Sequence, residues 1–436
     1  MSPFITGIIG IATLFILIAL RMPIAFIMAL VGFAGFSYLV SPDAAFRVLS
    51  KDLYNSFASY HLSVIPMFVW MGFLAFHSGM STRLYVAAYK LIGHVRGGLA
   101  MATQIACAIF GAICGSNTAT AAAMGAVSIP EMKKYKYDAS LSTASIAAGG
   151  ALGVLIPPSV IFLVYGVSTQ QSIGKLFVAG IFPGILLMFL YMITVYILTR
   201  RNPNLGPPGP RVSWKERGAA IGGGIWEALF VFVVSIGGLL AGWFTPTEAG
   251  AVGAFGVLVV ALIERKLSFE GFKNSLRDTT RTTAMIMLLV AGAVIFGRFM
   301  AVSQIPFAMA SWAGSLPIPS YAVIAIILGI YLVLGCFIDA LALILLTIPI
   351  FYPVAVTLLG YDPIWFGVII VMVVAMGVIT PPVGMNVYII KGIAKDVPLE
   401  TIFRGILPFL LALIICIILL VAFPQIATFL PSIITY

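Results

Sequence analysis

The sequence predicts an all-α protein that crosses a membrane many times and is built as two inverted repeats. Of its 436 residues, 61% are hydrophobic and only 9% are charged, whereas a soluble domain has about 25% charged residues. A spanning helix needs about 20 apolar residues, so the length allows about ten to twelve crossings and no large soluble domain. Two proline pairs also interrupt apolar segments at corresponding places in the two halves.

The first apolar segment, residues 4–20, is followed rather than preceded by its first charge, Arg21. This order is the reverse of a secretory signal peptide, so we expect a spanning helix with its N-terminus outside the cytoplasm. Residues 200–217 are rich in proline, glycine and basic residues, which is typical of a linker. We therefore predict a first repeat at 1–199, a cytoplasmic linker at 200–217 and a second repeat at 218–436.

The two halves share motifs at one offset. "GVLIPP" at 153–158 aligns with "GVITPP" at 377–382, and "GAICG" at 111–115 aligns with "GCFID" at 335–339, both 224 residues apart. Matched interruptions at a fixed offset indicate an internal duplication. For each half we predict about five spanning helices, a re-entrant hairpin and a broken helix. The hairpins are placed at about 98–132 and 320–356, and the broken helices at about 139–168 and 364–393.

The basic residues agree with an inverted arrangement. An odd number of crossings per repeat turns the second copy over, so that all but four of the 24 Lys and Arg residues fall in cytoplasmic segments. This distribution satisfies the positive-inside rule, which also accounts for the net charge of +10 without a nucleic-acid partner. The first hairpin then opens to the cytoplasm and the second to the outside. Two amphipathic stretches, 81–94 and 268–281, are expected to lie in the membrane surface at corresponding places.

The broken helices indicate ion sites. Proline lacks an N–H and clashes with the carbonyl four residues back, and irregular backbone at membrane depth is tolerated only when it is buried or lines a wet cavity. Transporters use the released carbonyls and the ends of half-helices to bind ions. A single proline pair could equally be a kink, but two pairs at a fixed offset favour two sites.

The hairpin tips supply further oxygen ligands. "CGSNTATAAAMG", 114–125, places Ser116, Asn117, Thr118 and Thr120 inside an apolar run. Hydroxyl and amide oxygens suit a hard cation, although small residues also form close packing seams between membrane helices. The second tip has Asp339 instead, and an ionisable residue at membrane depth is functional by default. The second site is therefore not a copy of the first.

Other polar residues have simpler interpretations. Glu248 in "TPTE" fits position N3 of a helix capping box. Arg298 is interpreted as an unpaired cation near the outer end of a helix, where it could meet an anionic substrate or a lipid headgroup. The three histidines show no metal-ligand spacing, so no metal other than Na⁺ is inferred. The chain has no G-x-x-x-x-G-K-[ST] motif for a nucleotide and no recognisable nucleophile–base pair, so we expect no enzyme and a process driven by an ion gradient.

Four motifs in order, "GSNTATAAAMGAVSIPEM", "AAGGALGVLIPPSV", "GWFTPTEAGAVGA" and "GVITPPVGMN", resemble the large membrane subunit of tripartite ATP-independent periplasmic (TRAP) transporters. The resemblance covers nearly the whole chain. It implies Na⁺-driven, elevator-type uptake of a small organic anion, a carboxylate or sulfonate, across the bacterial inner membrane. It also implies a periplasmic substrate-binding protein and a small four-helix membrane subunit. We expect the small subunit to be a separate chain, because the sequence starts at the first large-subunit helix.

The resemblance also assigns roles to residues. The first Na⁺ site would comprise Ser116, Asn117, Gly150, Gly153 and Pro157, the second Gly335, Asp339, Gly377, Thr380 and Pro382, and the substrate would lie near Asn117, Thr118, Thr380, Asn386 and Arg298. The alternative is a stand-alone Na⁺/anion symporter of the same architecture without a binding protein. A channel is less favoured, because the few acidic residues lie mostly in loops and do not line a continuous pore.

Overall fold

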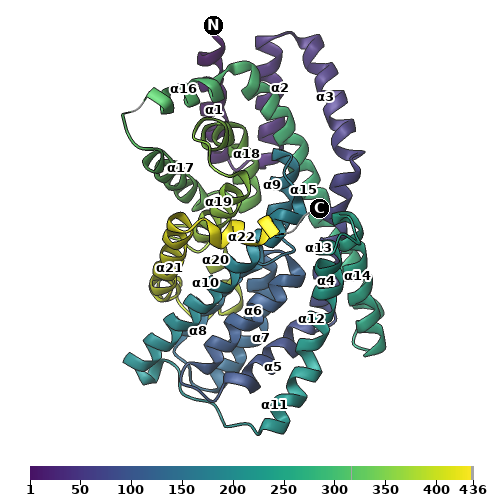
Figure 1. Ribbon diagram of the computed structural model, residues 1–436, viewed down its shortest axis with the longest axis vertical. Helices are drawn as coiled ribbons and strands as arrows, with labels where there is room; N and C mark the ends of the chain where they lie inside the picture. Colours follow the sequence, from purple (N-terminus) through teal and green to yellow (C-terminus); the bar gives the residue numbers. More distant parts are fainter. Residues whose placement is uncertain (316, 434–436) are drawn as a thin grey trace.

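The computed structural model describes residues 1–315 and 317–433, and this part of the chain is helical throughout, without strands (Figure 1). Seven of its helices are long and apolar enough to cross a membrane: Tyr60–His77, Ile173–Arg201, Trp214–Leu240, Pro246–Ile263, Phe269–Ser303, Ala340–Leu358 and Leu399–Ala422. Seven further apolar helices have only 10–17 residues. The predicted all-α membrane class is confirmed.

The first half contains ten α-helices. They are α1 (Pro3–Ala19), α2 (Ile24–Leu39), α3 (Pro42–Phe57), α4 (Val64–His77), α5 (Met80–Ile92), α6 (Gly98–Cys114), α7 (Asn117–Lys134), α8 (Ala139–Gly150), α9 (Val160–Thr169) and α10 (Ile173–Arg201). Short 3₁₀ turns precede α4 at Tyr60–Ser63 and follow α8 at Ala151–Val154. Side chains of Ser41, Asp138 and Ser172 cap α3, α8 and α10 by accepting from early backbone N–H groups.

The second half continues from α11 to α22. Its helices are α11 (Trp214–Ala220), α12 (Trp226–Phe232), α13 (Gly238–Leu240), α14 (Pro246–Ile263), α15 (Phe269–Ser303), α16 (Ile305–Ser315), α17 (Ser320–Gly335), α18 (Ala340–Tyr352), α19 (Pro363–Gly377), α20 (Met385–Ile393), α21 (Leu399–Ala422) and α22 (Gln425–Ile433), with π-helical turns at Ile221–Ile225, Val233–Gly237 and Pro353–Leu358. The predicted capping box at α14 is confirmed: the N–H of Thr245 donates to Oε2 of Glu248 over 2.7 Å.

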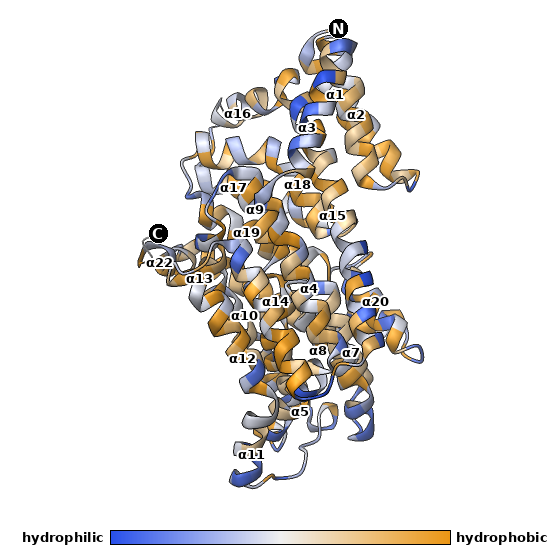
Figure 2. Ribbon diagram, turned by 90° about the vertical axis from the view of Figure 1, so that its right-hand side faces the viewer, coloured by the Kyte–Doolittle hydropathy of each residue, from blue (hydrophilic) through white to orange (hydrophobic). Residues whose placement is uncertain are grey.

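Several helix contacts occur twice, the second time between the helices that lie 224 residues away in the sequence from the first two. Helix α2 packs along α15, and α14 packs along α4; α6 contacts α8 as α17 contacts α19; α7 contacts α20 as α18 contacts α9. The hairpin α6–α7 lies in the lower half of the molecule and the hairpin α17–α18 in the upper half (Figure 1). Hydrophobic residues cover the middle of the molecule, and hydrophilic residues gather toward both ends (Figure 2). These contacts support the duplication inferred from the motifs.

The prediction that the two amphipathic stretches, 81–94 and 268–281, occupy corresponding places in the two halves is wrong. At the offset of 224 residues, α5 corresponds to α16, and α3 corresponds to the first turns of α15. Residues 268–281 are not a separate surface helix, because α15 continues without a break to Ser303. The apolar face of α5 is buried, and α5 packs on α6. Its amphipathic pattern thus marks a protein contact.

The connection between the halves is shorter than the predicted linker. Helix α10 extends to Arg201 and α11 starts at Trp214. The connecting segment is tied by backbone hydrogen bonds to the loop between α5 and α6: Gly97 N–H donates to the Gly206 carbonyl over 2.9 Å, and Gly209 N–H to the Gly93 carbonyl over 2.8 Å. The linker therefore lies against the start of the first hairpin.

Candidate functional site

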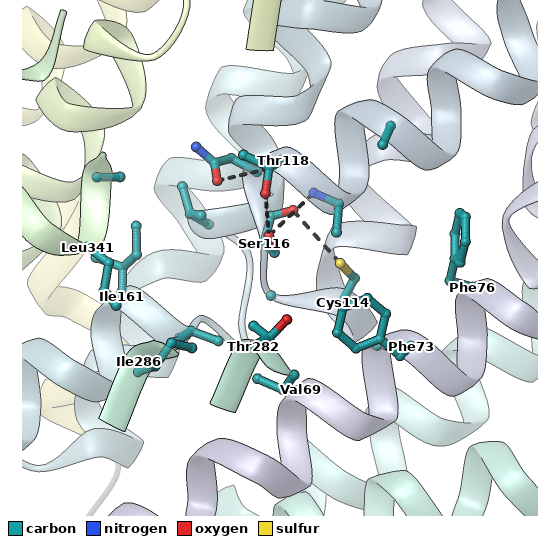
Figure 3. A pocket seen from close by; sticks show the side chains of 18 of the residues that line it. Val69, Phe73, Phe76, Cys114, Ser116, Thr118, Ile161, Thr282, Ile286 and Leu341 are labelled. Carbon is teal, nitrogen blue, oxygen red and sulfur yellow. Dashed lines mark hydrogen bonds between the residues drawn. The ribbon is translucent and has the colours of Figure 1, made fainter. Parts of the chain in front are cut away.

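The tips of both hairpins line one cavity of about 500 Å³ (Figure 3). The first tip contributes Ser116, Asn117 and Thr118, and the second contributes Asp339, Ala340 and Leu341. The first helix break adds Val154, Val160 and Ile161, and the opposite walls come from α4 and α15, with Val69, Gly72, Phe73, Phe76, Thr282, Met285 and Ile286. Two segments that are far apart in the sequence thus meet at a single site.

The first tip is a sharp turn with several polar groups. Helix α6 ends before Gly115, whose φ of +64° favours glycine. Ser116 then caps α7, and its hydroxyl lies 3.2 Å from that of Thr118. The Asn117 carboxamide accepts from the Thr118 N–H over 2.9 Å, while its Nδ2 is buried without a hydrogen-bond partner among the described residues. The tip therefore offers the hydroxyl oxygens of Ser116 and Thr118 to the cavity.

This tip packs directly on the first helix break. A Cβ on Gly115 would lie 2.6 Å from the carbonyl oxygen of Pro158, and a Cβ on Gly153 would lie 2.6 Å from that of Ser116. Only glycine allows such close backbone approach. Because Pro157 and Pro158 lack N–H groups, the break leaves carbonyls without their helical donors. Carbonyl and hydroxyl oxygens thus gather around Ser116.

A buried amide cluster lies behind the tip. Asn386, at the start of α20, is fully buried, and its Nδ2 donates to the carbonyl of Ala147 over 3.1 Å. Its Oδ1 has no hydrogen-bond partner within the part of the chain that the structure describes. A Cβ on Gly150 would lie 2.8 Å from Asn386 Nδ2 and 3.1 Å from the Asn117 carbonyl oxygen. Gly150 therefore permits contact between the two halves of the chain.

The second tip and break repeat the glycine contact. Gly111 lies against Gly153 in the first half, and Gly335 lies against Gly377 in the second. A Cβ on Gly111 would lie 2.7 Å from Gly153 Cα, and a Cβ on Gly377 would lie 2.6 Å from the carbonyl carbon of Gly335, whereas a Cβ on Gly335 would make an ordinary contact of 3.4 Å. Asp339 caps α18 by accepting from the Leu341 N–H over 3.0 Å. Its carboxylate therefore has a structural role in addition to any ionic one.

The structure separates the predicted site residues into groups. Ser116, Asn117, Thr118 and Asp339 line the cavity, while Gly150, Gly153, Pro157 and Asn386 pack behind the first tip. The cavity lining does not include Gly335, Gly377, Thr380 or Pro382, which form the second tip's base and break. The hydroxyl of Thr380 donates to the Met376 carbonyl over 2.7 Å, and Pro382 is exposed.

The interpretation of Arg298 as an unpaired cation is wrong. Its guanidinium forms an ion pair with Asp52, and Arg298 does not line the cavity. Asp52 lies on α3, a helix that the hydrophobicity pattern did not reveal, so this partner could not be identified from the sequence. The cavity walls on α4 and α15 were not predicted from the sequence either. Thr282, inside the run "TRTTAM", was the one polar signal for them.

Broken helices and hairpin tips that enclose a cavity inside a helical membrane protein define a solute transporter. Over residues 11–426 the chain matches the family described as "Tripartite ATP-independent periplasmic transporter, DctM component". The chain belongs to this family and is a transporter component, not an enzyme.

Several curated proteins are similar along most of their length. The C4-dicarboxylate TRAP transporter large permease protein DctM of Pseudomonas aeruginosa is 36% identical, over 90% of this chain and 91% of its own. The sialic acid TRAP transporter large permease protein SiaM of Vibrio cholerae is 32% identical, over 94% and 95%. The ectoine/5-hydroxyectoine large permease protein UehC of Ruegeria pomeroyi is 33% identical, over 96% and 97%.

Two solved structures share the fold at low sequence identity. The YdaH transporter of Alcanivorax borkumensis aligns with a TM-score of 0.59 at 13% identity, over 89% of this chain and 88% of its own. MtrF of Neisseria gonorrhoeae aligns with a TM-score of 0.59 at 17% identity, over 89% and 85%. At this identity the likeness concerns the fold alone.

Proposed function

We propose that this chain takes up a small organic anion, a carboxylate or sulfonate, in symport with Na⁺ across the bacterial inner membrane, with its N-terminus in the periplasm. The observation that carries the proposal is the convergence of both hairpin tips and the first helix break on one cavity. Released carbonyls and half-helix ends are the means by which transporters of this kind bind ions and anionic groups.

The two Na⁺ ions would bind on either side of the solute. The first would take oxygens from Ser116 and Asn117 and from the break between Gly150 and Pro157, where the close glycine contacts bring carbonyls together. The second would lie at Asp339, with backbone oxygens from the Gly377–Pro382 break. The solute would occupy the cavity near Asn117 and Thr118. Thr380 and Asn386 would lie behind it and would influence its binding by positioning the helix breaks.

The cavity's position supports an elevator motion. One wall belongs to α4 and α15, which pack with α14 and α2, and the other belongs to the hairpin tips and the first break. A solute held between these groups would change sides if the hairpins and broken helices slid along the α2–α4–α14–α15 group. The family description names a tripartite transporter. We propose that the other two components are a separate small four-helix membrane subunit and a periplasmic binding protein.

Uptake into vesicles tests the proposal. The chain would be reconstituted with its two partner components and given an inward Na⁺ gradient, an H⁺ gradient or neither, with and without ATP. We expect uptake that needs Na⁺ and the binding protein and is indifferent to ATP. Undiminished uptake in Na⁺-free buffer would refute Na⁺ coupling, and uptake without the binding protein would favour a stand-alone symporter.

A further inference from the structure

The cavity has few polar groups, and most of them belong to the hairpin tips. Apart from Ser116, Asn117, Thr118, Asp339 and Thr282, its lining consists of apolar side chains, glycines and Cys114. The walls include large hydrophobic residues: Phe73, Phe76, Phe110, Met285, Ile286, Ile161 and Leu341. Such a lining holds an apolar body and fixes its orientation through a few polar contacts at one place.

The cavity lining, within the described part of the chain, contains no basic side chain. Its only acidic side chain is Asp339, which is itself an anion when ionised. Arg298 is on the same helix as the wall residue Ile286, but twelve residues further on, which is roughly 18 Å along an α-helix. Its guanidinium is also engaged by Asp52. The cavity therefore offers no arginine or lysine to a second anionic group.

One of the two hairpin tips can receive an anion. Helix α7 begins at the cavity, and a helix N-terminus carries about half a positive charge. The hydroxyls of Ser116 and Thr118 at this position are half-buried, line the cavity and can donate hydrogen bonds to an anion. At the other tip, the N-terminus of α18 is capped by the carboxylate of Asp339, which repels an anion when ionised, whereas the caps of α7 are the neutral side chains of Ser116 and Asn117. The two tips therefore differ in what they can bind.

From this arrangement we infer that the transported solute is a monoanion with an apolar body, such as an aliphatic or aromatic monocarboxylate, and not a dicarboxylate. The inference rests on the proposed function, since it takes this cavity as the solute site. The single anionic group binds at the start of α7 with the hydroxyls of Ser116 and Thr118. A second carboxylate would lie against the buried apolar lining, such as Phe110, Ile161 and Ile286, where removal from water costs several kcal/mol per ion without a partner.

Matched acids test the inference on the purified full-length chain in lipid nanodiscs. Hexanoate and adipate have the same six-carbon chain with one or two carboxylates, and benzoate and terephthalate form an aromatic pair. Melting temperature would be measured against the concentration of each acid, in Na⁺ buffer and in K⁺ buffer of equal ionic strength. In Na⁺ we expect at least one monoanion to reach half-saturation at a concentration about tenfold lower than its dianion, a difference of about 1.4 kcal/mol.

A pair of lysine variants adds a gain-of-binding test. Thr282→Lys places a cation on the cavity wall, and Thr280→Lys makes the same change two residues away on an exposed position outside the lining. We expect Thr282→Lys to lower the half-saturating concentration of the dianion about tenfold and Thr280→Lys to leave it unchanged. If Thr282→Lys does not fold, the comparison of matched acids on the wild-type chain decides alone.

The outcomes separate this inference from the proposed function. Tighter binding of a dianion than of its monoanion, or no stabilisation by either monoanion, overturns the inference. Preference for the monoanion in both Na⁺ and K⁺ buffers supports the inference and counts against Na⁺ coupling. Preference for a dianion that appears only in Na⁺ would leave the coupling intact and overturn the inference alone.

Discussion

Arg298 and Asp52 join α15 to α3 through a two-point ion pair. Nε of Arg298 lies 2.9 Å from Oδ2 of Asp52, and Nη2 lies 3.1 Å from Oδ1. The Asp52 side chain is 5% exposed, and the Arg298 side chain is 56% exposed. Because the guanidinium fork matches both carboxylate oxygens, the pair fixes the outer helix α3 on α15 and holds the Arg298 side chain away from the cavity between the hairpin tips.

Removing this ion pair should affect stability and spare transport. We expect Arg298→Gln to destabilise the chain by about 1–3 kcal/mol, since it leaves the buried Asp52 carboxylate without its charged partner. Asp52→Asn should have a similar effect, and the double variant should cost less than the sum. Melting temperature and Na⁺-driven uptake would be measured, with Arg47→Gln, an exposed arginine on the same helix as Asp52, as control. A changed half-saturating solute concentration in Arg298→Gln, absent in Asp52→Asn, would restore a substrate role for Arg298.

One close glycine contact in each half, at Gly111 and at Gly377, should be intolerant of a methyl group. Gly111→Ala and Gly377→Ala would each place a Cβ within 2.7 Å of facing backbone, whereas Gly329 on α17 has open space around its Cβ position. Overpacking costs about 1–3 kcal/mol, so we expect both variants to be destabilised and to lose Na⁺-dependent uptake. Gly329→Ala should be neutral or stabilising. Thermal unfolding with and without Na⁺ measures this, and a neutral effect at Gly377 would contradict the close contact between Gly377 and Gly335.

The sequence was informative where one local rule decides the structure. The capping box at Thr245 and Glu248 depends on residues three apart, and it is present in the fold. The prolines at 157–158 and 381–382 interrupt their helices because of covalent chemistry that no tertiary contact can change. Ser116 and Asp339 were placed at turns between apolar runs, and both line the cavity as helix caps.

Other features depend on contacts between distant segments and could not be predicted. Asp52 and Arg298 are 246 residues apart in sequence, and α3 carries too many polar residues to stand out as an apolar run. The cavity walls on α4 and α15 are apolar residues of spanning helices, and periodicity does not say which face meets lipid and which meets a hairpin. For the same reason, the apolar face of α5 was predicted to meet the membrane surface, although it packs against protein.

An exposed ion pair between Lys133 and Asp396 should make a pH-dependent contribution. Nζ of Lys133 lies 2.7 Å from Oδ2 of Asp396, and this hydrogen bond lowers the pKa of the Asp396 carboxyl from its usual value. A carboxyl with a lowered pKa stabilises the folded state above its unfolded pKa of about 3.9, and this contribution is lost as the pH falls through the folded pKa. Asp396→Asn should therefore melt below wild type at neutral pH and approach it in acid. Melting temperatures from neutral pH to about pH 3 at low and high salt would check this, and a gap that widens in acid would contradict it.

Labelling should show that the hairpins open to opposite sides of the membrane. Lys134 at the end of α7 and Ser320 at the start of α17 are both exposed, whereas the four native cysteines are buried. In a cysteine-free background, we expect Lys134→Cys to react with a membrane-impermeant maleimide from the cytoplasmic face and Ser320→Cys from the periplasmic face. Intact cells and inside-out vesicles provide the two faces. Labelling of both residues from one face would rule out the inverted repeat.

Asp339→Asn should separate the capping role of this residue from an ionic one. Asparagine caps helices as well as aspartate does, so the hydrogen bonds to the N–H groups of Leu341 and Ala342 can be retained while the charge is removed. A lone carboxylate at this depth is costly, and a bound cation offsets that cost. We therefore expect the Na⁺ concentration for half-maximal uptake to rise about tenfold or more, as loss of a charged ligand implies, while stability without Na⁺ stays the same or increases.

A second aspartate cap in the same half supplies the control for Asp339. Asp362 caps α19 by accepting from the Trp365 N–H over 2.8 Å, and it lies outside the cavity lining. Asp362→Asn makes the same chemical change at the same kind of helix position, so it should leave the Na⁺ dependence of uptake unaltered. Melting temperature would be recorded for both variants with and without Na⁺, because a cation at Asp339 should raise it in wild type and in Asp362→Asn more than in Asp339→Asn. Equal Na⁺ dependence in all three proteins would mean that Asp339 serves only as a cap and that the second Na⁺ site lies elsewhere.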